Sequence, residues 1–305
     1  MLTPADNSHV HPGQATLAVE IVSGESAVTS AFATSPMKLL APRARGRSVW
    51  ACTSSFGGGL VAGDQTRFDV RVGPGARCYA GTQASTRIYR NPSLRPCSHT
   101  THATLDAGSL LVFAPDPVQA FAGSAYTQRQ EFQLASDASL VLVDWFTSGR
   151  AARGERWAFS RFASRNEVHR SSRRKEAHSH KTQNEPPYVG CYERAEGELI
   201  FLDSIRLDPA DGPLDSSHRT GRFNCLATLL LLGPLLRDLA GGLLAGVSDR
   251  PVQCRTPLLC SASPLRDGAL LRVAGEHVES VARELHRHLA ALAPMLGDDP
   301  WARKW

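Results

Sequence analysis

Residues 66–72 read TRFDVRV, a stretch in which apolar and charged side chains alternate after the first position. In an extended chain, Phe68 and Val70 fall on one face and Arg67 falls on the other. This period of two is typical of a half-buried strand in an antiparallel sheet, and residues 130–134 repeat it. The pattern predicts strands that cover a core with one face only.

Two further stretches are apolar at every position. Residues 110–113 read LLVF and residues 140–143 read LVLV, as expected of strands that are covered on both faces. Turn-forming sequences separate the strands, among them residues 73–75 (GPG) and 106–108 (DAG). These patterns predict a mainly β fold made of two stacked sheet layers.

The last third of the chain has a different pattern. Residues 223–239 are helical in composition, and Pro234 predicts a kink or a join between two helices. Residues 278–292 place apolar side chains at steps of three and four, with charged residues between them, which predicts an amphipathic helix. Gly297 is a plausible stop signal. The sequence therefore predicts two C-terminal α-helices.

The domain organisation follows from these patterns. Residues 1–12 are polar and are expected to form a flexible tail, and residues 13–305 are expected to form a single β-rich domain. An exposed insertion is expected at about residues 165–197, because its centre is charged, serine-rich and without periodicity.

Composition indicates a soluble, cytoplasmic protein. Seven cysteines with no C-x-x-C pair are typical of scattered thiols in a reducing compartment. The apolar stretch 226–247 is interrupted by Pro234 and Arg237, so it is too short to span a membrane. The basic residues of 170–181 have no aromatic residues between them, which argues against a nucleic-acid partner.

A glycine run ends in an acidic residue at 57–64, GGGLVAGD. Backbone N–H groups in such a run can hold a phosphate. The stretch lacks the Gly-Lys-Ser/Thr ending of a P-loop, however, and a strand is expected to follow it rather than a helix. A tight turn with Asp64 directed inward is the better interpretation.

Other candidate groups are Glu155 and the histidines. Glu155 stands beside two arginines, so it could be a catalytic acid or one half of a surface ion pair. Because no matching nucleophile and base are nearby, the structural interpretation is favoured. Neutral imidazole suits nickel or zinc, so each close pair of histidines is a possible two-ligand fragment, although chance pairing competes with this interpretation. The pairs are His9/His11, His99/His102, His178/His180 and His286/His288.

Five segments, in order and at consistent spacing, resemble the UreD family, called UreH in some organisms. They are residues 35–40 (SPMKLL), 57–64 (GGGLVAGD), 82–90 (TQASTRIYR), 115–117 (PDP) with Phe121, and 148–150 (SGR) with 154–155 (GE). Each segment is a weak motif alone, and the five together are specific.

The resemblance implies a single β-rich domain of two stacked sheet layers with two helices, and no catalysis by this chain. It implies an accessory protein that helps insert nickel into apo-urease. The implied partners are UreF, the GTPase UreG bound through UreF, and apo-urease. No nucleic acid, membrane or tightly bound cofactor is implied. The resemblance also implies that nickel is in transit, through a water-filled tunnel in the UreD-like subunit.

Three acidic residues match the family as nickel-transit acids. Asp64 matches the acid of the Gly-Asp motif, Glu155 that of the Gly-Glu motif, and Asp203, in LIFLDS at 199–204, a third. Carboxylates bind nickel more weakly than thiolate or imidazole does, so such acids would let the ion leave. The expected insertion departs from compact family members and blurs the match at Asp203.

Two alternatives from other classes remain open. A nickel-storage or metal-buffer protein would bind metal tightly through the histidine pairs, without partners. A β-rich hydrolase would use Glu155 and Asp64 as an acid/base pair and would turn over substrate alone. Co-purification with UreF-like and urease chains separates these alternatives from the accessory-protein hypothesis.

Overall fold

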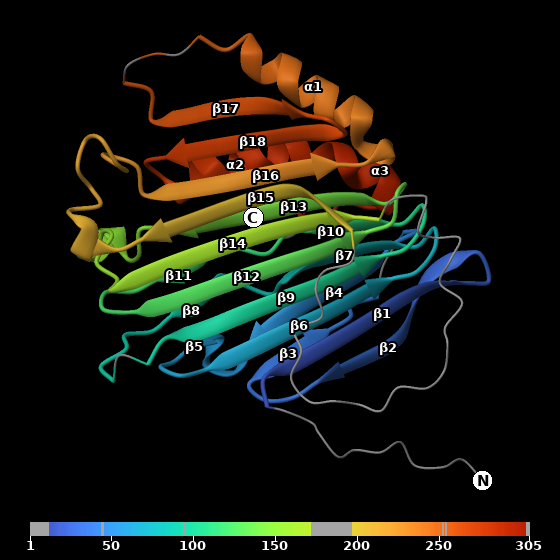
Figure 1. Cartoon of the computed structure of the whole chain (residues 1–305), viewed down its shortest axis with the longest axis horizontal. Coiled ribbons are helices and arrows are strands. Elements are labelled where there is room, and N and C mark those ends of the chain that lie inside the picture. Colours follow the sequence, from blue (N-terminus) through green and yellow to red (C-terminus); the bar gives the residue numbers. More distant parts are fainter. Residues whose placement is uncertain are drawn as a thin grey trace.

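Two β-sheets stacked face to face make up most of the molecule, and helices lie against one of them (Figure 1). The structure is a computed structural model, and it describes residues 12–43, 46–93, 95–171, 197–251, 253 and 255–302. The predicted mainly β fold with two sheet layers and C-terminal helices is confirmed.

The first sheet has seven strands. In spatial order they are β15 (Glu198–Leu207), β14 (Arg161–Arg170), β12 (Ala125–Leu134), β9 (Cys97–Leu105), β6 (Gln65–Val72), β1 (Gln14–Val22) and β2 (Glu25–Ala33). Strands from β14 to β1 pair in parallel, and the two edge pairs, β14 with β15 and β1 with β2, are antiparallel.

The second sheet has eleven strands. Its main path is β17 (Leu258–Leu265), β18 (Gly268–Gly275), β16 (Cys225–Leu232), β13 (Ser139–Thr147), β10 (Leu110–Phe113), β7 (Arg77–Thr82), β4 (Val49–Ser55) and β3 (Met37–Leu40). A side branch next to β13 contains β11 (Val118–Ala120), β8 (Thr86–Ile88) and β5 (Gly59–Leu60).

The antiparallel pairing expected for residues 66–72 and 130–134 is wrong. Strand β6 pairs in parallel with β1 and β9, and β12 pairs in parallel with β9 and β14. Parallel neighbours need a long crossover between them. Here the crossover is a strand of the other sheet, because the chain runs from β6 to β7, β9, β10, β12, β13 and β14 alternately in the two layers. An alternating pattern shows that one face is buried and carries no information on strand direction.

The helices follow β16 and β18. They are α1 (Arg237–Ser248), α2 (Val278–Leu289) and the one-turn α3 (Ala293–Leu296). Short 3₁₀ turns complete the set, at Phe56–Gly58, Ala151–Arg153, Pro209–Asp211, Pro234–Leu236 and Ala290–Leu292. The amphipathic helix predicted for residues 278–292 is confirmed, and Gly297 ends the last turn with a φ of 83°.

The helix expected over residues 223–239 is wrong. Most of this stretch is the central strand β16, with α1 beginning only at Arg237. Strand β16 is paired on both sides, with β13 and β18, and its leucines are buried on both faces. Burial in a sheet covered on both faces overrides the helical preference of a leucine-rich sequence.

Two apolar layers hold the molecule together. One lies between the sheets, where residues such as Phe68, Leu111 and Phe132 are almost fully buried. The other lies between the second sheet and the helices, and it includes Val141 from β13 and Leu285 from α2. Strand β13 is therefore buried at every position, which explains its continuous apolar sequence.

The first residues of the insertion expected at about 165–197 belong to a strand. Residues 165–170 belong to β14, whose side chains Asn166 and Val168 point into the molecule. Charged residues alternate with Asn166 and Val168 in this stretch. The high charge was interpreted as an exposed loop, so the alternation typical of a strand was not recognised. Residues 172–196 lie outside the described residues, as do residues 1–11 of the tail expected at 1–12.

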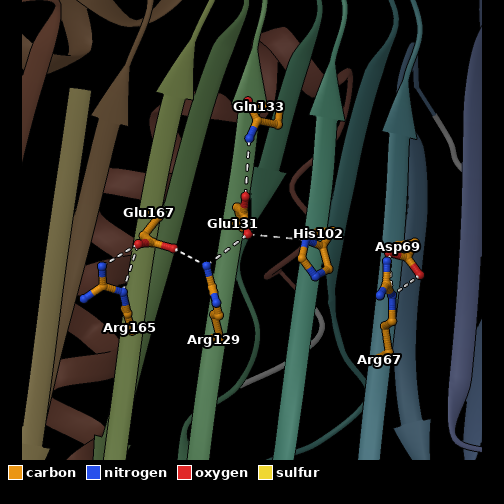
Figure 2. A network of polar contacts seen from close by, with 8 residues as sticks. All are labelled: Arg67, Asp69, His102, Arg129, Glu131, Gln133, Arg165 and Glu167. Carbon is orange, nitrogen blue, oxygen red and sulfur yellow. Dashed lines mark hydrogen bonds and ion pairs between the residues drawn. The ribbon is translucent and has the colours of Figure 1, made fainter. Parts of the chain in front are cut away.

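The outer face of the seven-stranded sheet carries a row of ion pairs across β9, β12 and β14 (Figure 2). Glu167 contacts Arg165 at 2.6 Å and Arg129 at 3.0 Å, and Arg129 also reaches Glu131 at 3.5 Å. His102 lies 3.7 Å from Glu131. Charged side chains on this face and apolar ones on the inner face explain the alternation in the sequence.

Candidate functional site

A cavity of about 80 Å³ lies between the two sheets. A water molecule needs roughly 10–15 Å³ of such volume together with polar partners, so the cavity has room for several. Four of the five segments that resemble the UreD family supply lining residues. These residues are Met37, Gly58, Leu60, Thr82, Ala84, Ser85, Thr86, Pro115 and Asp116. Segments far apart in the sequence thus meet around one polar interior space.

Asp144 is the central acidic residue of this cavity. It lies on β13 and is only 6% exposed, yet its carboxylate accepts three hydrogen bonds from the opposite sheet. The donors are the Gln128 amide at 2.9 Å, the Ser164 hydroxyl at 2.7 Å and the Asn166 amide at 2.7 Å. Three donors and no acceptor around one carboxyl group are the environment of an ionised carboxylate.

Burial and hydrogen bonding act on Asp144 in opposite directions. Burial raises the pKa of this carboxyl group, and the hydrogen bonds from Asn166, Ser164 and Gln128 offset only part of the rise, so the pKa stays above its usual value. Asp203 adds a smaller upward contribution through its negative charge. A negative charge in a cavity with room for water can attract a cation.

Further polar side chains line the same space, among them Thr82, Asp116 and His99. The Thr82 hydroxyl donates to Asp116 at 3.1 Å and accepts the Asp116 backbone N–H at 2.8 Å. His99, on β9, is hydrogen-bonded through both ring nitrogens, to Thr66 and to Thr101. The cavity therefore offers carboxylate and hydroxyl oxygens and one imidazole.

Sequence reasoning did not select Asp144, and it considered His99 only as one half of the pair His99/His102. A signal for Asp144 was present, since an acid directly follows the apolar run 140–143 in a strand that is buried on both faces. A buried charge in such a strand needs partners. His99 carried no comparable local signal, because its partner Thr66 lies on another strand.

Asp64 stabilises a turn. Its Oδ2 atom accepts the backbone N–H of Val61 at 2.9 Å, and its own N–H donates to the Val61 carbonyl at 3.1 Å. Gly57 and Gly58 have φ values of 73° and 68°, which favour glycine. The tight turn predicted here is confirmed.

Glu155 forms a two-pronged ion pair with Arg150, with N–O distances of 2.8 and 2.5 Å. The bonds from Arg150 lower the pKa of this carboxyl group. Arg150 also stacks on the Phe121 ring, 4.3 Å from its centre, and Glu155 accepts the Ala122 N–H at 3.4 Å. The ion-pair interpretation of Glu155 is thus confirmed, and the pair fastens its loop to residues 121–122.

Asp203 closes one edge of the sandwich. It lies on the inner face of β15, is 7% exposed, and accepts a hydrogen bond of 2.7 Å from Arg272 on β18. Asp64, Glu155 and Asp203 thus occupy three separate places. Within the described ranges, no three His, Cys, Asp or Glu side chains lie close enough together to hold a metal ion.

The histidine pairs that the structure describes are divided. His99 faces the cavity, whereas His102 lies on the outer face of the same sheet (Figure 2). His286 contacts Asp299 at 3.3 Å, and His288 contacts Glu284 at 3.0 Å. The pairs His9/His11 and His178/His180 lie outside the described residues. Neither described pair forms a two-ligand site.

Fold and cavity define a class of protein: a β-sheet scaffold whose two stacked sheets enclose a space that is lined in part by polar side chains and has room for several waters. In the described part of the chain, no helix is long and apolar enough to cross a membrane.

Comparison with known proteins assigns the family. The profile described as UreD urease accessory protein matches residues 11–305. The chain is 47% identical to urease accessory protein UreD of Sorangium cellulosum, over 96% of this chain and 84% of that protein. It is 32% identical to urease accessory protein D of Oryza sativa subsp. indica, over 93% of each chain, and 30% identical to that of Arabidopsis thaliana, over 93% and 98%. The chain belongs to the UreD family of urease accessory proteins.

Proposed function

We propose that this protein is a non-catalytic scaffold in urease maturation that passes Ni²⁺ through the cavity between its sheets to apo-urease. It acts in the cytoplasm with a UreF-like protein that recruits the GTPase UreG. The buried, hydrogen-bonded carboxylate of Asp144, placed where the family segments converge, is the observation that carries this proposal.

The chemistry of the cavity suits an ion in transit. Nickel binds oxygen ligands less strongly than nitrogen or sulfur ligands, so a carboxylate and waters would hold it briefly. Asp144 keeps its position without the ion because three donors from the other sheet fix its oxygens. The charge is therefore in place before the ion arrives, and little reorganisation is needed.

The acids Asp64, Glu155 and Asp203 stay part of the proposal as transit acids. Asp203 is best placed of the three, since its charge acts on Asp144 and it lies on the inner face of its sheet. Asp64 and Glu155 are engaged with their own loops, by Val61 and by Arg150.

Substitution of Asp144 by Asn tests the proposal. This change removes the charge and keeps the shape. Among the residues that the structure describes, none donates to Oδ1 of Asn166, so this amide can turn over and accept from the new side chain. The complex with apo-urease and the accessory proteins should form normally, while urease activity and bound nickel fall severalfold. Normal activation by an intact Asp144→Asn complex would refute passage through this cavity.

Rescue with the matched change Asp144→Glu separates charge from shape. The longer carboxylate keeps the negative charge in a slightly different position, so activation should recover in part.

Assays of the isolated chain with GTP and with ester or amide substrates should show no turnover, and turnover without partners would favour the hydrolase alternative.

A further inference from the structure

His99 is the imidazole that lines the cavity, and its surroundings assign its protons. The Thr66 hydroxyl lies 2.9 Å from Nδ1 of His99 and 3.2 Å from the carbonyl oxygen of Ser98. A carbonyl can only accept, so the single hydroxyl proton of Thr66 goes to Ser98. Nδ1 of His99 must then carry a proton and donate it to Thr66.

This tautomer leaves the lone pair of the imidazole on Nε2. The Thr101 hydroxyl lies 3.2 Å from Nε2 and is the donor that satisfies it. Thr101 is fully buried and occupies the next inward position on the same strand, β9. The nitrogen that would otherwise bind a metal is therefore occupied by a hydroxyl proton.

Burial also keeps the ring neutral. Desolvation lowers the pKa of His99 to about 4, so the imidazole is uncharged at the pH of a cell. A neutral imidazole is a good ligand for nickel, better than a carboxylate or water. Without its hydroxyl partner, His99 would add a nitrogen ligand to the cavity that contains Asp144.

We propose that Thr101 masks Nε2 of His99, so that Ni²⁺ in the cavity meets oxygen ligands and no free imidazole. The inference rests on the proposed passage of nickel through this cavity. A hydrogen bond of this kind stabilises by about 1 kcal/mol net, so its removal should tighten nickel binding roughly fivefold. Thr101 is thus a positioning residue that keeps the affinity of the cavity low enough for release.

The test compares Thr101→Ala with Thr101→Ser in the complex of the full chain with its accessory partners. Both changes remove the methyl group, and only Ala removes the hydroxyl. Chelator competition should show about fivefold tighter Ni²⁺ binding for Thr101→Ala and wild-type binding for Thr101→Ser. X-ray absorption should detect imidazole scattering from nickel in the Ala variant alone, and urease activation by this variant should slow.

A second substitution tests whether the imidazole of His99 is the group that binds nickel in the Thr101→Ala variant. In the double variant Thr101→Ala/His99→Gln, the tighter binding and the imidazole signal should both disappear. Equal nickel affinity in Thr101→Ala and Thr101→Ser, with no imidazole signal in either, would overturn the mask.

The wild-type complex supplies a measurement that needs no change at position 101. The X-ray absorption spectrum of nickel bound to the wild-type complex should contain no imidazole signal from His99. The His99→Gln substitution should therefore leave this spectrum unchanged. An imidazole signal that this substitution removes would mean that His99 already binds the ion, and the mask would be wrong even if Thr101→Ala failed to fold.

The two proposals fail differently. If Asp144→Asn impairs activation but the Ala and Ser variants at position 101 bind nickel equally, the passage stands and the mask is wrong. If Asp144→Asn activates urease normally, the passage is wrong and the mask falls with it.

Discussion

The side-chain amide of Asn166 donates to Oδ2 of Asp144 across 2.7 Å, and this bond ties β14 of one sheet to β13 of the other. Ser164 and Gln128 reinforce the same connection from the seven-stranded sheet. The carboxylate is therefore both the charge of the cavity and a structural link between the layers.

This double role predicts different stabilities for two changes of Asp144. In Asp144→Ala, three buried donors lose their acceptor, so the free energy of unfolding should fall by about 3 kcal/mol. In Asp144→Asn it should fall by only about 1 kcal/mol, because Asn166 can reorient. Urea unfolding measures both values. Equal losses would show that the network cannot rearrange.

The transit acids should contribute unequally to activation. Asp203→Asn should lower urease activation more than Glu155→Gln, because Asp203 lies on the inner face and acts electrostatically on Asp144. Glu155 pairs with Arg150 in a loop. Activation assays with limiting nickel, on complexes shown to be intact, measure the order. The reverse order would place the ion path near residues 148–155.

His99 should make stability depend on pH. Its pKa is lowered to about 4 by burial, below the value of about 6.5 in an unfolded chain. The unfolded state therefore binds a proton first as the pH falls, so this contribution is complete above about pH 6.5 and is lost between pH 6.5 and 4. Urea unfolding of wild type and of His99→Gln should show a difference in the free energy of unfolding that narrows as the pH falls through this range. A difference in unfolding free energy that does not change with pH would contradict the lowered pKa of His99.

Glu284 should stabilise the helical layer down to a lower pH than the range in which the contribution of His99 is lost. Burial raises its pKa, but His288 and Arg250 outweigh burial and lower it to about 2. The folded value lies below the unfolded one, so the stabilisation is present above about pH 4.5 and is lost as the pH falls towards 2. Glu284→Gln should cost about 2 kcal/mol at pH 7. The exposed Glu279→Gln on the same helix is the control and should change stability little.

The contribution of each ion pair on the outer face to stability should depend on the salt concentration and on the burial of the pair. Glu167 is largely buried and contacts two arginines, so Glu167→Gln should cost about 1 kcal/mol at low salt. Asp69→Asn, which breaks the more exposed pair with Arg67, should cost less than about 0.5 kcal/mol. Unfolding at low and high ionic strength measures both, and the cost for Glu167 should shrink as salt rises. A loss of stability that does not change with ionic strength would indicate that Glu167 acts through packing and not through its charge.

Local patterns were sufficient for several features. The alternation in residues 66–72, the apolar run at 140–143 and the amphipathic stretch at 278–292 predicted a buried face, a strand covered on both sides and a helix, as observed. These features depend on spacing within a few residues, which burial of apolar side chains translates directly into structure.

Other features depend on contacts between distant residues. The parallel pairing of β6 with β9, the strand at 225–232 and the meeting of Asp144 with Asn166 arise only when the chain has crossed between its two sheets several times. Strand direction, the burial of a leucine-rich segment in a sheet and the partners of a buried carboxylate are set by neighbours from other parts of the chain. No pattern within a single segment carries that information, because hydrophobic periodicity reports which face is buried and not what covers it.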